Sequence, residues 1–336
     1  MRGSYLHDNE NGILGSPLSN NSAADGQGEV LIETSELFHN GHGDGQSHNL
    51  YLGRYAKVTL RASYSHQSVI GHLVKSRAYE NHLEYNLLAD EAAGNGSYEV
   101  DLPEGGQSYL IGNSIEQSQA GATQGNSIVI TYGEEGTNAG LQQLWLSANT
   151  VVNDATTGTF LRVVGSPTGA LVDNVFRGPG TLLTGGSHLA QTSNWTDALG
   201  DPLLVDPLHQ DYHLRANSPC IGMGTAPGSG NGQSLLPVSE YAPVASVVPR
   251  PVGAKLDLGA YQYQAPADGG SGDAGSSDGG SGDAGQGDAG SSDGGGPLTA
   301  PTSGCSSGAP EPLLLLGGLL LLLAWRGRSR VVKDGL

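Results

Sequence analysis

The chain has 336 residues, a length that typically corresponds to about two domains. Glycine supplies 54 residues, more than twice its usual share of about 7%, and only 14% of residues are charged, which argues against a helical bundle. The net charge of −18 excludes a surface suited to nucleic acid, and two cysteines are too few for a disulfide scaffold.

Residues 1–225 repeat one pattern, a short apolar–polar alternation around an Asn or Ser followed by a glycine-rich turn. The repeated residues are Ser4, Ser35, Ser63, Asn86, Asn113, Asn149, Asn174 and Asn194. Their mean spacing of about 27 residues indicates one supersecondary unit per turn, with insertions in loops. We therefore predict an all-β fold, a right-handed parallel β-helix solenoid. A β-propeller fits less well because its blades need about 40–45 residues.

The repeated Asn and Ser residues are expected at tight bends between strands. Asn tolerates left-handed backbone geometry, and its side chain can hydrogen-bond along the stack of coils. Inward Val, Ile and Leu side chains would form the core. The sequence begins inside a repeat, and residues 1–7 lack the apolar stretch of an export signal. We therefore expect a truncated N-terminus, with more coils and a signal peptide upstream.

A histidine-rich stretch spans residues 38–48 and holds three His and one Asp. These residue types could bind a transition metal. The stretch is rich in glycine, however, and is expected to be a loop without the supporting contacts that metal ligands need. We predict no metal site and no cofactor.

The segment around Lys75 carries the most suggestive chemistry. Lys75-Ser76, followed by Asn81 and Asn86, resembles the motif of the chondroitinase-B and alginate-lyase β-helix family. In that family the lysine is the base that removes the C5 proton of a uronic acid, so the resemblance implies this role for Lys75. Arg77 lies two residues further, on the same face of a strand, and a neighbouring cation would depress the pKa of the lysine.

One part of that family's pattern is missing. An arginine about one coil later serves as the acid, whereas residues 100–105 contain Asp101 and Glu104 but no Arg or His. Two carboxylates would repel a uronate substrate. The chain is therefore expected not to be an enzyme, and a uronan lyase with Lys75 as base is the alternative.

A carbohydrate surface needs aromatic platforms and polar partners. Seven of the 13 tyrosines fall within residues 51–109. We predict that the binding residues are Arg54, Arg61, Tyr64, Tyr79 and Tyr85, next to Lys75 and Arg77. Tyrosine also favours strands, so packing on the exterior of the coils is the alternative for these rings.

Residues 204–263 differ from the repeats. Asp211-Tyr212-His213-Leu214, Ser218-Pro219 and residues 257–261 resemble the C-terminal end of many bacterial β-helix proteins of the pectate-lyase-like superfamily. The resemblance implies a closing segment, residues 226–264, that covers the open edge of the last coil. Cys220 is expected to be a small buried hydrophobe there.

Residues 265–304 form a Gly/Ser/Asp linker with an Asp at every fifth position over much of its length. The linker has too few large apolar residues to bury, so we predict that it is disordered. Calcium binding is an alternative without support, because calcium repeats have a nine-residue period with a large apolar residue.

Residues 305–336 combine Cys305, an apolar run at 309–325 and an arginine cluster. A run of 17 residues is at the short end of the roughly 17–25 needed for a transmembrane helix. Arginines that follow such a run stay cytoplasmic. This order of parts resembles the C-terminal sorting signals of myxobacterial surface proteins, which implies that Cys305 is the processing and anchoring residue.

Together these features predict a protein anchored in the cell envelope by its C-terminus and displayed at the cell surface. Its expected partners are a polysaccharide or surface matrix and, through the C-terminal segment, the membrane. Besides the lyase alternative, a structural spacer or adhesin remains open.

Overall fold

The computed structural model describes residues 1–16, 25–124 and 127–265. The predicted linker from residue 266 onward, Cys305 and the apolar run at 309–325 lie outside the described residues. No helix in the described part of the chain is long and apolar enough to cross a membrane.

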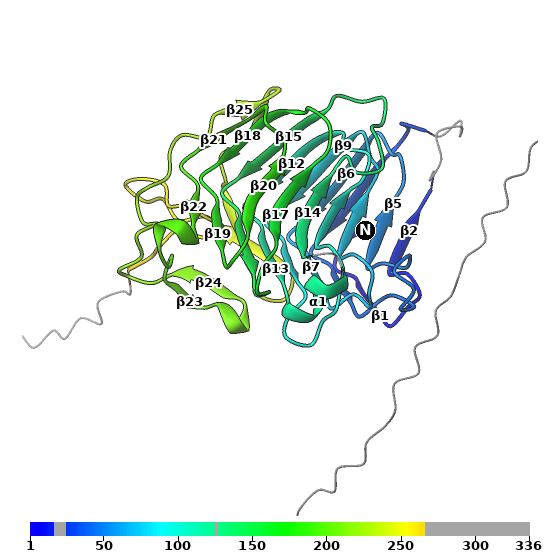
Figure 1. Cartoon of the computed structure of the whole chain (residues 1–336), viewed down its shortest axis with the longest axis horizontal. Helices are drawn as coiled ribbons and strands as arrows, with labels where there is room; N and C mark the ends of the chain where they lie inside the picture. The colour runs from blue at the N-terminus through cyan, green and yellow to red at the C-terminus, as the bar shows by residue number, and fades with distance from the viewer. Residues whose placement is uncertain (17–24, 125–126, 266–336) are drawn as a thin grey trace, which may run out of the picture. The chain divides into compact units, whose positions relative to one another are not determined.

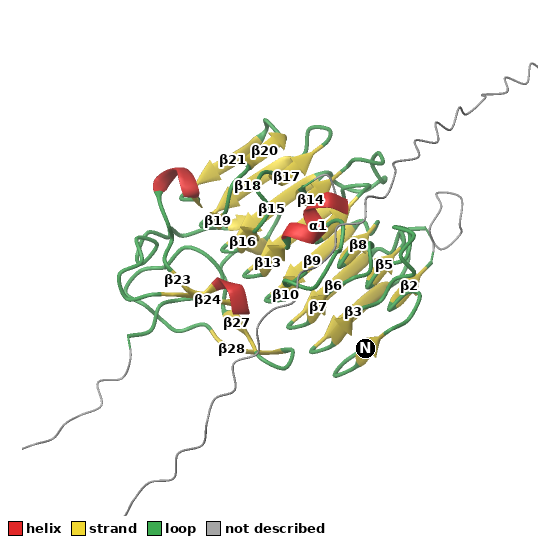
Figure 2. Ribbon diagram, turned by 60° about the horizontal axis from the view of Figure 1, so that its bottom comes forward, coloured by secondary structure: helices red, strands yellow, loops and turns green. Residues whose placement is uncertain are grey.

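The described chain winds through three parallel sheets in turn, and each coil adds one strand to each sheet (Figures 1 and 2). Sheet 1 contains, in spatial order, β1 (Tyr5–His7), β4 (Glu36–Phe38), β7 (Tyr64–His66), β10 (Leu87–Ala89), β13 (Ser114–Gln117), β16 (Thr150–Asn153), β19 (Val175–Arg177) and β22 (Trp195–Thr196). Sheet 2 contains β2 (Ile13–Gly15), β5 (Leu50–Leu52), β8 (Val74–Ser76), β11 (Val100–Leu102), β14 (Ile128–Tyr132), β17 (Thr159–Val163) and β20 (Thr181–Gly185). Sheet 3 contains β3 (Glu29–Glu33), β6 (Lys57–Arg61), β9 (Glu80–Glu84), β12 (Gln107–Ile111), β15 (Gln143–Ser147), β18 (Thr168–Val172) and β21 (Leu189–Thr192).

This topology confirms the predicted parallel β-helix. Helix within the described residues is limited to α1 (Gln119–Gln124) and two short 3₁₀ turns. The core follows from the strand period of two, because alternate side chains of each strand point into the coil. Stacking then aligns like positions, and the buried columns are Leu37, Leu88, Ile115, Val151 and Phe176 in sheet 1; Leu50, Val74, Val100, Ile130 and Leu161 in sheet 2; and Ile32, Leu60, Leu83, Leu110, Leu146 and Leu171 in sheet 3.

The eight repeated Asn and Ser residues form one continuous hydrogen-bonded stack, which we call the Asn/Ser ladder. From Ser4 to Asn174, the backbone N–H of each member donates to the side-chain oxygen of the member in the next coil. From Asn86 onward the side-chain amide donates along the stack as well. The predicted stacking is therefore confirmed.

The prediction of left-handed geometry for the ladder residues themselves is wrong. The residue before each of them takes that conformation, with φ between +47° and +65°, at Gly3, Thr34, Ala62, Tyr85, Gly112, Ala148, Asp173 and Ser193. A ladder residue must point both its N–H and its side chain along the stack. The left-handed turn between sheets 3 and 1 therefore falls on its predecessor.

Residues 197–263 add short elements outside the coils. These are η1 (Asp197–Leu199), β23 (Leu204–Asp206), η2 (Pro207–His209), β24 (Asp211–Leu214), β25 (Ser229–Gly230), β26 (Gln233–Ser234), β27 (Ser239–Ala242) and β28 (Ser246–Pro249). The strands pair as three antiparallel hairpins.

The C-terminal segment, residues 204–263, packs on the outer faces of sheets 1 and 3. Its apolar side chains bury Leu87, Val152 and Val175 of sheet 1 and the Trp145 ring of sheet 3. These contacts run along the flank of the coils and include Trp195 of the last coil. The outward apolar residues of the coils account for them, because these residues need a cover of their own. Cys220 is fully buried as predicted, and burial raises the pKa of its thiol to about 11.

Candidate functional site

Lys75 lies on the outer face of sheet 2, where the register aligns it with Tyr51 of β5 and Asp101 of β11. Its neighbour Val74 points into the core, so the lysine side chain points out. The Lys75 Nζ atom lies 2.7 Å from Asp101 Oδ2 and 3.1 Å from Glu135 Oε1. Only 11% of the lysine side chain is exposed. The ammonium therefore lies between two carboxylates.

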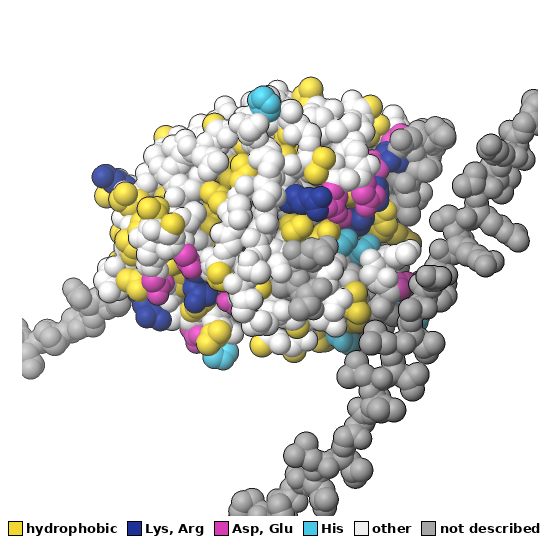
Figure 3. All heavy atoms as spheres, in the orientation of Figure 1, with side chains coloured by type: hydrophobic (Ala, Val, Ile, Leu, Met, Phe, Trp, Pro, Cys, Tyr) yellow, Lys and Arg dark blue, Asp and Glu magenta, His cyan; other side chains and the backbone are white. Residues whose placement is uncertain are grey.

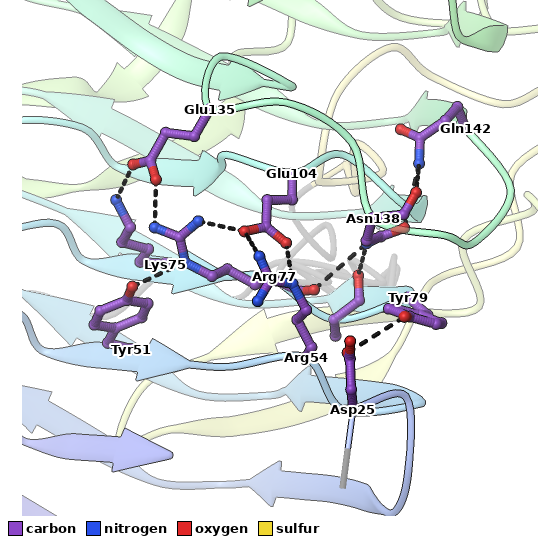
Figure 4. Close-up of polar contacts among 11 residues, drawn as sticks. Asp25, Tyr51, Arg54, Lys75, Arg77, Tyr79, Glu104, Glu135, Asn138 and Gln142 are labelled. Carbon is purple, nitrogen blue, oxygen red and sulfur yellow. Dashed lines mark hydrogen bonds and ion pairs between the residues drawn. The ribbon is translucent and has the colours of Figure 1, made fainter. Parts of the chain in front are cut away.

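Two arginines extend this cluster (Figure 4). Arg77 donates from Nη1 to Glu104 Oε1 at 2.6 Å and from Nε to the Tyr51 hydroxyl at 2.8 Å, and its Nη2 pairs with Glu135. Arg54 forms a two-bond ion pair with the same Glu104. The structure thus brings together Lys75, Arg77 and Arg54, but it places an acid at each of them.

Glu135 comes from the loop between β14 and β15. Its backbone N–H donates to Pro103 O at 2.7 Å, and Asn138 Nδ2 in the same loop donates to Ala78 O at 3.0 Å. The Glu135 side chain is 43% exposed, and Lys75 and Arg77 together hold its carboxylate. An anchored loop thus delivers one accessible carboxylate to a pair of cations.

The cluster is electrically balanced, with three cations against Asp101, Glu104 and Glu135. Acidic and basic side chains lie side by side on this face in the space-filling view (Figure 3). Burial alone would lower the pKa of Lys75, but the charges of Asp101 and Glu135 outweigh it and the pKa is raised. The predicted depression of the pKa of Lys75 is therefore wrong, because carboxylates and not arginines are its closest partners.

Stacked rings border the cluster. His48 and His72 lie with their ring centroids 4.5 Å apart, and Tyr98 stacks on His72 at 4.9 Å. Burial lowers the pKa of His48 to about 3 and that of His72 well below its usual range, so both rings are neutral. Among the described residues, no group of three or more His, Cys, Asp or Glu side chains is arranged to hold a metal ion.

The other predicted binding residues are spread over separate faces. Arg61 and Tyr85 lie at sheet 3, with the guanidinium 5.7 Å from the ring centre. Tyr85 is buried, and its hydroxyl accepts a hydrogen bond from Val238 N–H. Tyr64 lies on sheet 1. Tyr79 borders the Lys75 cluster, where its hydroxyl donates to Asp25 (Figure 4). One continuous binding face made of all five residues is not present.

Sequence reasoning missed Glu135 and the role of Tyr51. Tyr51 aligns with Lys75 one coil away, but it lies 12 residues before Ser63 whereas Lys75 lies 11 residues before Asn86, so counting from the ladder does not give this register. Glu135 carries no signal either, since its loop lies outside the strand register. No family model, curated protein or solved structure matches this chain.

Proposed function

We propose that this chain is a right-handed β-helix protein of the cell surface that binds acidic carbohydrate without cleaving it. The observation that supports the proposal is the Glu135 carboxylate, which Lys75 and Arg77 hold together at the edge of solvent. A uronate carboxylate has the same shape, charge and hydrogen-bonding capacity as this group. Rotation of the Glu135 side chain would open one binding position on each cation, while Lys75 stays paired with Asp101 and Arg77 with Glu104.

The neighbouring groups suit a sugar acid as well. The Tyr51 ring lies beneath both cations, 5.5 Å from Lys75 Nζ and 5.6 Å from the Arg77 guanidinium carbon. Such contacts hold the cations in place when their carboxylate partner leaves. Arg77 also keeps Glu104, so it remains oriented after Glu135 has moved. The site would then exchange an internal carboxylate for an external one.

Elimination is not part of this proposal. A general base must give up its proton near neutral pH, which requires a lysine pKa well below the ordinary value. The pKa of Lys75 is raised instead, and its nearest carboxylate, Asp101, is fully buried. We expect no unsaturated uronate from polygalacturonate or alginate, as followed by ultraviolet absorbance. If the parent chain forms unsaturated uronate and Lys75→Ala does not, the proposal is contradicted.

Glu135→Gln is expected to bind hexagalacturonate about tenfold more tightly than the parent chain, equivalent to about 1.4 kcal/mol. The variant removes the internal competitor and leaves the loop anchored by its backbone. Isothermal titration calorimetry at low ionic strength measures the effect. Glu134→Gln is the matched control, because it removes the same charge one residue away, where the carboxylate lies 3.7 Å from Arg162.

The control is expected to change affinity by less than about twofold, because the Glu134 carboxylate pairs with Arg162, whereas Lys75 and Arg77 pair with Glu135. Adding Lys75→Gln to Glu135→Gln should abolish the gain. Equal gains in affinity for Glu134→Gln and Glu135→Gln would show that the effect comes from the change in net charge alone. That result would overturn the proposed site. A folded Glu135→Gln chain that binds no hexagalacturonate would overturn it too.

Display at the cell surface rests on the sequence of the tail, and we propose that Cys305 is its processing residue. Cys305→Ala is expected to leave the chain uncleaved in the inner membrane. Deletion of residues 309–336 should release the protein in soluble form. Cell fractionation with surface labelling distinguishes these products. Normal cleavage and display of Cys305→Ala would leave only a plain membrane anchor.

A further inference from the structure

A second candidate site lies between sheet 1 and the C-terminal segment, away from the Lys75 cluster. A pocket of about 460 Å³ opens there. Its walls include the rings of Tyr64, Tyr241 and Tyr261 and the carboxylates of Glu36 and Asp211, with Val244 among the lining residues. Neither a family resemblance nor the proposed function uses this pocket.

The tyrosine walls are held rigidly. The Tyr64 ring stacks on His66 with centroids 3.8 Å apart and planes 4° from parallel, and its hydroxyl is bound to Glu91. The Tyr241 ring centre lies 6.4 Å away at an angle of 56°. Such fixed aromatic surfaces offer contact area with little loss of side-chain entropy on binding.

The polar lining selects the kind of ligand. Glu36 is 30% exposed at its side chain, and its carboxylate contacts His66 Nε2 at 3.1 Å. The Asp211 side chain is 42% exposed and contacts His213 Nδ1 at 2.7 Å. Each carboxylate keeps further lone pairs for a ligand. The lining contains no Lys or Arg, and its histidines, His209 and His213, pair with Asp206 and Asp211, so it offers an anionic ligand no cation without an acidic partner.

A strained turn forms part of the lining. Val244 and Ala245 have φ of +52° and +49° in the turn between β27 and β28. A β-branched residue at positive φ is an outlier that costs stability, and turns of this kind favour Asn or Gly. Val244 is nevertheless 89% exposed, so packing does not account for it. Positive φ also occurs at turns that the fold requires, such as the one at Thr34, so the strain at Val244 supplements the pocket geometry and does not stand alone.

We propose that this pocket binds a neutral pyranose unit of a polysaccharide. The tyrosine rings would contact the apolar C–H face of the sugar, and Glu36 and Asp211 would accept hydrogen bonds from its hydroxyl groups. Val244 would contact the sugar from the turn. The pocket adds a neutral-sugar site to the acidic-sugar site proposed above and does not depend on it.

Saturation-transfer difference NMR on the full chain tests the proposal with three neutral probes: cellohexaose, mannohexaose and xylohexaose. At least one should give a signal, and Glu36→Gln and Asp211→Asn should each weaken its affinity by about tenfold, the effect of a lost hydrogen bond to a charged group. Glu135→Gln is the control, because it alters only the acidic-sugar site. It should leave the neutral signal unchanged.

Val244→Gly gives an independent readout that does not depend on the carboxylates. Glycine relieves the strain, so the melting temperature should rise by about 2–4 °C, while affinity for the neutral probe falls. Absence of signal from all three probes would overturn the proposal. So would a signal that survives both carboxyl variants and Val244→Gly unchanged.

Discussion

Asn149→Ala is expected to lower the free energy of unfolding by about 4 kcal/mol, because it opens the Asn/Ser ladder at a buried position. The Asn149 side-chain oxygen accepts from the backbone N–H and the amide of Asn113, both at 2.9 Å. Its amide donates to Leu110 O at 2.8 Å and to Asn174 Oδ1 at 2.9 Å. Alanine leaves these buried groups without a partner. Each unpaired group lowers the free energy of unfolding by about 1–3 kcal/mol, and local relaxation of the chain reduces this loss.

Two further variants show whether the ladder itself carries the effect. Asn194→Ala, at the last described member and only partly buried, should cost about 1–2 kcal/mol, because water can replace the lost partners. Asn149→Ser should fall between the two, since Ser35 and Ser63 already serve as members of the ladder. Chemical denaturation measures all three. Equal losses at Asn149 and Asn194 would show that stacking contributes little.

Much of the fold could be predicted because a stacked coil leaves a periodic trace. Every coil needs one polar residue at the turn into sheet 1, so the eight ladder residues could be aligned without a structure. The left-handed conformation of the residue before each ladder residue could not be predicted from the sequence. That position is occupied by residues as different as Thr34, Tyr85 and Asp173, so composition carries no signal there.

The candidate site was predicted only in part, for a related reason. Lys75 lies in a strand and Arg77 in the turn after it, and their spacing of two residues predicts that they share a face. Glu135 lies in an insertion within the longest ladder step, the 36 residues from Asn113 to Asn149. The spacing locates the insertion along the chain, but it does not say onto which coils the loop folds. The acid that neutralises both cations was therefore missed.

A buried carboxyl group was overlooked for a third reason, a change of side-chain direction at a corner. Glu99 precedes β11, and simple alternation would place it on the outer face with Asp101. Its N–H instead donates to Val129 O at 3.0 Å, and its carbonyl accepts from Val74 N–H at 3.1 Å. This aligns Glu99 with Leu73 and Val129, both of which belong to the core.

The Glu99 side chain is fully buried, and neither carboxyl oxygen has a hydrogen-bond partner among the described residues. Burial raises the pKa of Glu99 well above 4.5, with further contributions from Asp90 and Glu116. Burial also raises the pKa of Asp90 to about 6 and that of Glu116 to about 8. The core therefore holds a neutral carboxylic acid where the adjoining coils have Leu73 and Val129.

Glu99→Leu is expected to stabilise the chain by about 2 kcal/mol or more at neutral pH, by replacing an unpaired polar group with the residue of the coil below. The gain should grow with pH. In the parent, folding takes up a proton at Glu99, so stability falls as pH rises above about 4.5, by up to about 1.4 kcal/mol per pH unit until the raised pKa is reached. The leucine variant lacks this contribution.

Glu99→Gln separates the two causes, because it removes the ionisation but keeps an unpaired polar group in the core. Urea unfolding from pH 4 to pH 8 should show that Gln and Leu share the flatter pH dependence, whereas only Leu is more stable than the parent at pH 4. A parent that gains stability across this range relative to Glu99→Gln would mean that the carboxylate is ionised and paired in the folded chain. Glu99 would then be a member of a polar network and not a misplaced core residue.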